Sequence, residues 1–207
     1  MRAVLMLAAA GLALAACNQK PTAPASGSDT VSLPASVMPP APPSAPSGPA
    51  APAPGFVHDK GADVFGYYLP AKEVKVGNWR LTALSLGQES EFADWEAGKR
   101  TATYAPVMLE FEDLASPTET NELGQKVHKV TTRVLPTSYA VSGGKLAFAG
   151  QDAKLGPVGF AGSVDLAKLK ALKAKGPNGG PETILTGDLK VGATEFKGLN
   201  FTWFGGD

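Results

Sequence analysis

Apolar residues recur at every second position in several segments of the chain. In 107–112 and 199–203 this alternation places one set of side chains on a core face and the other in solvent when the backbone is extended. Glycines interrupt such segments repeatedly, as they do in β-sandwiches and β-barrels. The pattern predicts nine strands, at 63–68, 79–86, 103–112, 126–135, 138–142, 145–149, 157–164, 183–191 and 195–204.

Two local signals refine this prediction. Gly143-Gly144 links two predicted strands, and glycine takes the positive φ angles of a two-residue turn at little cost, so a β-hairpin is expected there. A short helix is predicted at 166–175, because Asp165 can cap its amides and Gly176-Pro177 ends it. A second helical turn is possible at 90–98. Phe92 and Trp95 lie there among three acidic residues, and a fourth, Glu89, comes just before the segment.

These elements predict an all-β fold. Residues 56–207 suffice for one domain, which at this length buries about 70% of the surface of the unfolded chain. Closed or sandwiched antiparallel sheets leave few open edges. We therefore expect a single antiparallel β-barrel or β-sandwich with one short helix across an end. Small residues such as Gly159, Ala161 and Gly162 leave open whether its interior contains a cavity.

The segment 17–55 has a different composition. Prolines and alanines dominate it, and it carries almost no charge, so it lacks the apolar surface needed to offset the entropy of ordering. We expect a disordered Pro/Ala-rich tether. Its reach lies between about 35 Å as a flexible coil and about 120 Å as extended polyproline II.

The first sixteen residues have the organisation of a signal peptide. Arg2 supplies the positive start, Ala3 to Leu14 form an apolar core, and small residues follow. A membrane-spanning helix needs about 20 apolar residues. The polar residues from Asn18 onward end this run too early, so a spanning anchor is not expected.

Leu14-Ala15-Ala16-Cys17 resembles the lipobox of bacterial lipoproteins. The resemblance implies that the sulfur of Cys17 receives a diacylglycerol, that the chain is cut before Cys17, and that the new amine is acylated, for example with palmitate. Two or more acyl chains give stable anchoring. Lipoproteins kept in the inner membrane tend to have aspartate after the cysteine. Asn18 departs from that, so the outer membrane is expected, with the domain in the periplasm.

Composition and charge limit the chemistry of the chain. The 19 basic side chains equal the 19 acidic ones in number, so no basic excess is available for nucleic acid. The single cysteine excludes an internal disulfide and any multi-cysteine metal site. His58, expected in a loop before the first strand, and His128, expected half-buried, are too few for the three ligands of catalytic zinc. We expect no metal and no cofactor.

Candidate acid–base residues are Glu110 and Glu112. Two residues apart on a strand, they project from one face at about 6.6 Å, a separation that glycosidases use. On a strand whose other face is apolar, however, alternating glutamates are typical of a solvent face. No nucleophile motif accompanies them, so no catalytic residue is assigned.

The predicted helix carries four lysines. Lys168 and Lys170 are surface candidates for contact with anionic headgroups or cell-wall polymers, although lysines on a helix more often only solvate it.

The sequence favours a lipid-anchored, non-enzymatic binding or structural module of the cell envelope. Its partners would be the membrane, through the acyl chains on Cys17, and an envelope protein or cell-wall polymer. The alternative is a lipocalin-like carrier of an apolar small molecule or lipid, since eight-stranded barrels can just enclose one. An enzyme assembled from distant strands is a third possibility.

Overall fold

The computed structural model describes residues 55–122 and 124–206. The predicted signal peptide, lipobox and tether lie outside the described residues and stay predictions, except for the last tether residue, Gly55, whose carbonyl accepts from the Tyr139 amide. In chain order the elements are β1 (Phe56–His58), β2 (Gly66–Pro70), β3 (Lys75–Val76), β4 (Trp79–Leu86), α1 (Glu89–Glu96), β5 (Val107–Asp113), β6 (Thr118–Thr120), β7 (Lys126–His128), β8 (Thr131–Val134), β9 (Pro136–Ser142), β10 (Lys145–Asp152), β11 (Gly156–Val164), α2 (Leu166–Lys173), β12 (Leu185–Val191) and β13 (Thr194–Phe204).

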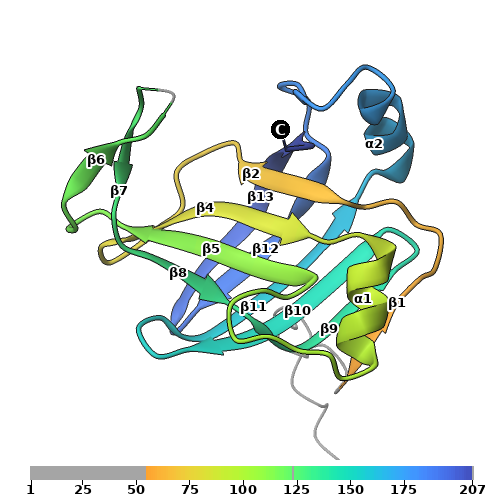
Figure 1. The fold of residues 1–207 in the computed structure, drawn as a ribbon, viewed down its shortest axis with the longest axis horizontal. Helices are drawn as coiled ribbons and strands as arrows, with labels where there is room; N and C mark the ends of the chain where they lie inside the picture. The colour runs from red at the N-terminus through yellow and green to blue at the C-terminus, as the bar shows by residue number, and fades with distance from the viewer. Residues whose placement is uncertain (1–54, 123, 207) are drawn as a thin grey trace, which may run out of the picture. The chain divides into compact units, whose positions relative to one another are not determined.

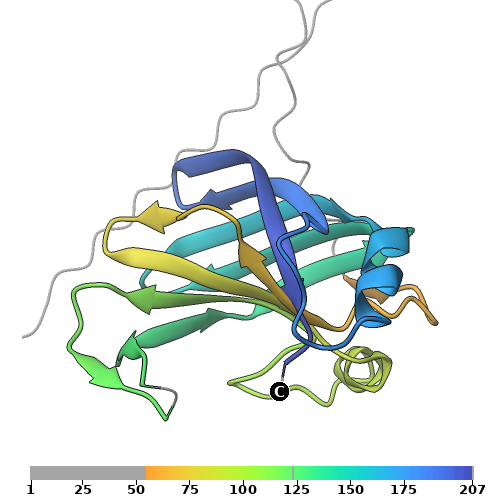
Figure 2. The same cartoon turned by 90° about the horizontal axis from the view of Figure 1, so that it is seen from above.

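One sheet of 11 strands forms the body, in the order β1-β9-β10-β11-β12-β13-β2-β4-β5-β8, with β3 beside β4. All neighbours pair antiparallel except β1 and β9, which are parallel. Strands β8 and β9 are consecutive in the chain but lie toward opposite ends of this order. The sheet therefore curls back on itself into a half-barrel (Figures 1 and 2).

The two ends of the strand order, β8 on one side and β9 and β10 on the other, meet along a line here called the seam. Side chains, and not backbone pairing, close it. On one part of the seam the Thr132 hydroxyl of β8 donates to the Asp152 carboxylate of β10 at 2.8 Å. On another part α1 inserts Phe92 and Trp95, which are buried and stack edge-on against Tyr139 and Phe56. The helix thus fills a gap that no strand of the sheet occupies.

Large aromatic side chains fill the interior. Phe111, Phe148, Phe160 and Phe201 are all essentially inaccessible to solvent. The Phe160 ring lies over Gly187, where a Cβ atom would come within 2.5 Å of it. The space beside this small inward residue is therefore filled by the neighbouring ring.

Gly162 shows the same close packing, because a Cβ atom there would lie 2.8 Å from the Phe160 ring. Gly159 and Ala161, the other small residues of β11 considered in the sequence as a source of a cavity, are half-buried. They lie on the outer face, because inward-facing Phe160 lies between them.

The sequence predicts this fold class correctly, and two local predictions are confirmed. Gly143 and Gly144, at φ 55° and 73°, form the turn between β9 and β10. Asp165 accepts a hydrogen bond from the amide of Lys168 and caps α2.

One local prediction was wrong in detail. The segment 126–135 is not one strand: β7 pairs only with β6, whereas β8 pairs with β5 in the main sheet. The possible helical turn at 90–98 is confirmed as α1, so the described part of the domain carries two short helices, α1 and α2.

Candidate functional site

The two glutamates singled out by their spacing are held by arginines. Strand register places Arg80 beside Glu112 and Arg133 beside Glu110. The Arg80 guanidinium bonds Glu112 Oε1 through Nε at 2.6 Å and also through Nη2. Arg133 Nη2 lies 3.6 Å from Glu110 Oε1. Such charge-assisted cross-strand pairs stabilise a sheet.

Glu112 also departs from the predicted solvent-facing position, because it is only 7% exposed. Alternation assigned it correctly to the outer face of the strand, but the Arg80 side chain of the neighbouring strand covers it there. The two carboxylates therefore serve as separate ion pairs and do not form an acid–base pair.

The lysines of α2 differ in their surroundings. Lys168 is exposed and lies 3.3 Å from Asp165, its own helix cap. Lys173 turns inward and donates to the carboxylate and backbone carbonyl of Asp63. It thereby fastens residues 59–65, here called the strap, across the end of the half-barrel. Lys170 is exposed beside this contact.

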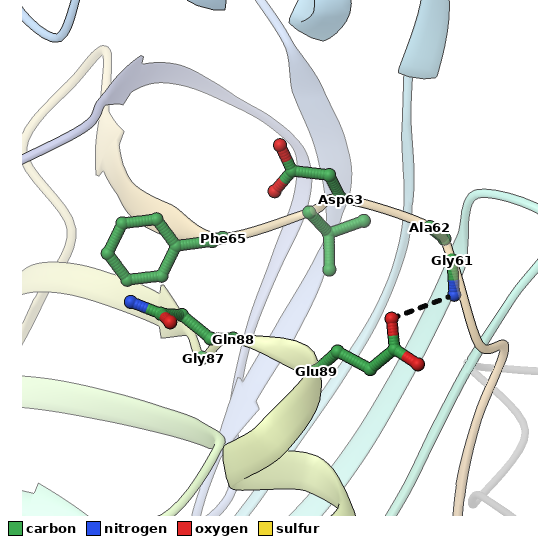
Figure 3. Close-up of a pocket in the computed structure, with 8 residues that line it drawn as sticks. Gly61, Ala62, Asp63, Phe65, Gly87, Gln88 and Glu89 are labelled. Atoms are coloured by element: carbon green, nitrogen blue, oxygen red, sulfur yellow. Dashed lines mark hydrogen bonds between the residues drawn. The ribbon is translucent and has the colours of Figure 1, made fainter.

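Two shallow hollows flank the strap. The first, of about 290 Å³, lies between the strap and the start of α1, where the Gly61 amide donates to Glu89 at 3.2 Å (Figure 3). The second, of about 370 Å³, lies between the strap and α2 and is lined by Leu166 and Lys170. The Gly61 amide and the Lys173 ammonium already bind groups of the domain. Both hollows are therefore the spaces left beside these two contacts of the strap.

The histidines lie far apart in the topology. His58 belongs to β1, not to a loop as the sequence suggested; its ring stacks on Phe92, and Nδ1 lies 2.8 Å from Glu96 Oε1. Burial, and next the Glu96 carboxylate, raise the pKa of Tyr139, whose hydroxyl donates to the same oxygen. This cluster joins β1, α1 and β9.

His128 lies on β7, where it is half-buried as predicted, with Nδ1 3.1 Å from the Ser116 carbonyl. The part of the chain that the structure describes contains no group of three His, Cys, Asp or Glu side chains placed to hold a metal ion.

A projecting hairpin is the most conspicuous feature outside the half-barrel. Strands β5 and β8 are direct neighbours, with Glu112 opposite Thr131, and a turn of two residues could join such strands. Instead the chain leaves the sheet at residue 114 and returns at residue 130. The segment 114–130 is here called the arm. Its described residues, 114–122 and 124–130, include the two-stranded sheet β6–β7, which stands away from the body (Figures 1 and 2).

The arm adds nothing to the core. None of its described residues belongs to the buried cluster, and every residue of β6 is exposed. Local contacts shape it: the Lys129 amide donates to the Pro117 carbonyl at 2.9 Å, and Glu119 lies 3.4 Å from the Lys129 ammonium.

The arm was missed at the sequence level because 126–135 reads as one continuous strand. The overlooked signal was Asn121 to Gly124, a turn sequence between two short β-branched segments.

Comparisons with protein-family models, with curated proteins and with solved structures gave no match. Within residues 55–122 and 124–206, no helix is long and apolar enough to cross a membrane.

Proposed function

We propose that this protein is a lipid-anchored, non-enzymatic binding module of the bacterial cell envelope, and that the arm is its contact element. The observation that carries the proposal is the arm itself, an excursion between two adjacent strands that buries no core residue among those described. Connecting segments that project from a rigid scaffold without adding to its packing often carry binding residues.

The interior favours this function over that of a carrier. A lipocalin-like carrier needs room inside the barrel for its ligand. Here rings such as those of Phe148 and Phe160 occupy the inward positions, and Phe160 covers the two glycines beside it. A surface contact requires no such room.

The arm can be tested by removing it. Replacing residues 115–129 with Asn-Gly should leave the thermal midpoint within a few degrees of the parent, because the core loses nothing. Chemical crosslinking in cells should yield high-mass species with the parent chain and lose them with the armless chain. The midpoint is measured by circular dichroism and the adducts by immunoblot.

The matched control changes Lys168 and Lys170 to serine. Both side chains are exposed, and the helix α2 that carries them lies well away from β6 and β7 (Figure 1). Adducts should persist in this variant. Loss of adducts in the lysine variant together with their persistence in the armless chain would instead assign contact to α2 and refute the arm.

The anchor rests on the resemblance of residues 14–17 to a lipobox. Changing Cys17 to serine removes the sulfur that would be acylated, and about 0.8 kcal/mol of membrane affinity per buried CH₂ with it. The variant should move from the membrane to the soluble fraction on cell fractionation, with the circular dichroism of the domain unchanged. Retention of the serine variant in membranes would refute lipid anchoring.

A further inference from the structure

One edge of the arm is open. Strands β6 and β7 pair in a register that places Glu119 opposite Val127. On either side of this pair, the Lys129 amide donates to Pro117 and the Asn121 amide donates to Gln125. Hydrogen-bonded and non-hydrogen-bonded pairs alternate along antiparallel strands. The backbone N–H and C=O groups of Glu119 therefore point toward β7. Those of Thr118 and Thr120 point away from β7, to the open side of β6.

No described strand lies beside that side of β6, since its sheet has two strands only. Proteins usually protect open edges with charged side chains, most often lysine, with proline, with a bulge or by keeping the edge strand very short. Strand β6 is three residues long and carries one charge, at Glu119, but it has no lysine, proline or bulge, and threonine favours the extended backbone. Its outward-pointing backbone groups can therefore still accept another strand of fitting charge.

We propose that β6 takes up an extended segment of a partner protein by strand addition. In this arrangement the N–H and C=O groups of Thr118 and Thr120 exchange hydrogen bonds with the added strand. The proposal rests on the arm being the contact element, and it names the class of partner: an extended peptide with a basic residue opposite Glu119.

Charge argues against a second copy of this chain as the added strand. Two β6 strands paired antiparallel about a two-fold axis would place Thr118 opposite Thr120, and Glu119 opposite the other Glu119. That central pair is non-hydrogen-bonded, the type in which side chains come closest. Like charges directly opposite destabilise a sheet. Glu119 lies 3.4 Å from the Lys129 ammonium, but its side chain is still 56% exposed, so a lysine or arginine in a partner strand can also reach it.

The test uses a defined peptide and the chain from residue 17 onward with Cys17→Ser. Acetyl-Thr-Val-Thr-Lys-Thr-Val-Thr-amide is titrated into the ¹⁵N-labelled protein, and amide shifts are followed by NMR. The amides of Thr118 and Thr120 should move most. A peptide with glutamate in place of its lysine should bind about threefold more weakly. Equal binding of both peptides, or no response at Thr118 and Thr120, would overturn the proposal.

Two substitutions at one position separate backbone from side-chain recognition. Thr120→Pro removes an N–H that points outward and takes no part in the β6–β7 ladder, and edge strands tolerate proline. Thr120→Val keeps that N–H. Affinity for the lysine peptide should fall at least tenfold with proline and stay within twofold with valine. Unchanged amide shifts at Val127 show that the arm itself is intact in the proline variant.

The alternative outcomes are distinct. Equal losses with valine and proline would mean that the side chain is recognised, which overturns strand addition. Shifts at Thr118 and Thr120 that depend on protein concentration without peptide would identify a second copy as the occupant. If removing the arm abolishes crosslinks in cells while the peptide leaves β6 unaffected, the arm is still the contact element, but strand addition is wrong.

Discussion

Phe160→Ala is expected to lower the free energy of unfolding by about 3–5 kcal/mol. The Phe160 ring is only 2% exposed and packs edge-on against Phe201 at 5.7 Å between ring centroids. It also covers Gly162 and Gly187. Since glycines have no side chains that can move into the space, the cavity cannot collapse, and the cost should lie high in this range. Urea denaturation followed by tryptophan fluorescence measures it.

Leu69→Ala is the control for this measurement. Leu69 is a strand residue on the outer face and is 38% exposed, so its truncation should cost no more than about 1 kcal/mol. Similar small losses in both variants would contradict a filled interior. They would also revive the carrier function, because a barrel with room to spare tolerates the removal of one ring.

Local signals predicted much of the sheet. Strand β4 has the predicted bounds, and the turn at Gly143-Gly144 requires only residues adjacent in the sequence. The same holds for α2, whose N-cap is Asp165 and whose last residue, Lys173, lies three residues before Gly176. In each case the signal and the structure that it specifies lie within a few residues of each other.

Closure of the half-barrel was not predictable in this way. Phe56 pairs with Tyr139, more than eighty residues later in the chain, and three residues are too few to show a strand period. Trp95 and Phe92 fill the seam beside them, but their spacing indicates only a helix with one apolar face. Which gap that face fills depends on tertiary contacts.

The charged residues of the candidate site show a second limit. The alternation around Glu112 assigns its face, but its burial comes from Arg80, which only the pairing of β4 with β5 places beside it. Between His128, the last residue of β7, and Thr131, the first of β8, the chain passes from one sheet to the other. The hydropathy pattern of the sequence does not change at this point. Hydropathy therefore did not reveal the arm, and with it the candidate contact surface; the turn sequence from Asn121 to Gly124 was the local sign of it.

Asp152→Asn is the second substitution with a large expected effect, and it concerns the seam. Burial works against the charge of Asp152. The Lys154 amide at 2.7 Å, the Thr132 hydroxyl at 2.8 Å and the Leu155 amide at 3.0 Å outweigh it and hold the pKa of this carboxyl below its ordinary value. The asparagine variant keeps one acceptor oxygen but loses the charge, so we expect a loss of about 1.5 kcal/mol at pH 7.

The pH dependence identifies the carboxylate as the cause of that loss. Because the pKa is lower in the folded chain than in the unfolded one, the stabilisation is complete above about pH 4 and disappears as the pH falls through the folded value. Urea denaturation at pH 7, 5 and 3 should therefore show equal gaps in the free energy of unfolding between parent and variant at the first two values and a smaller gap at the third.

The control is Asp94→Asn, whose exposed ion pair with Lys99 joins no strands, and its unfolding should match that of the parent at pH 7. A gap at Asp152 that persists unchanged at pH 3 would mean that the hydrogen bonds across the seam do not depend on the charge. In that case the link between β8 and β10 would rest on the shape of the side chain alone.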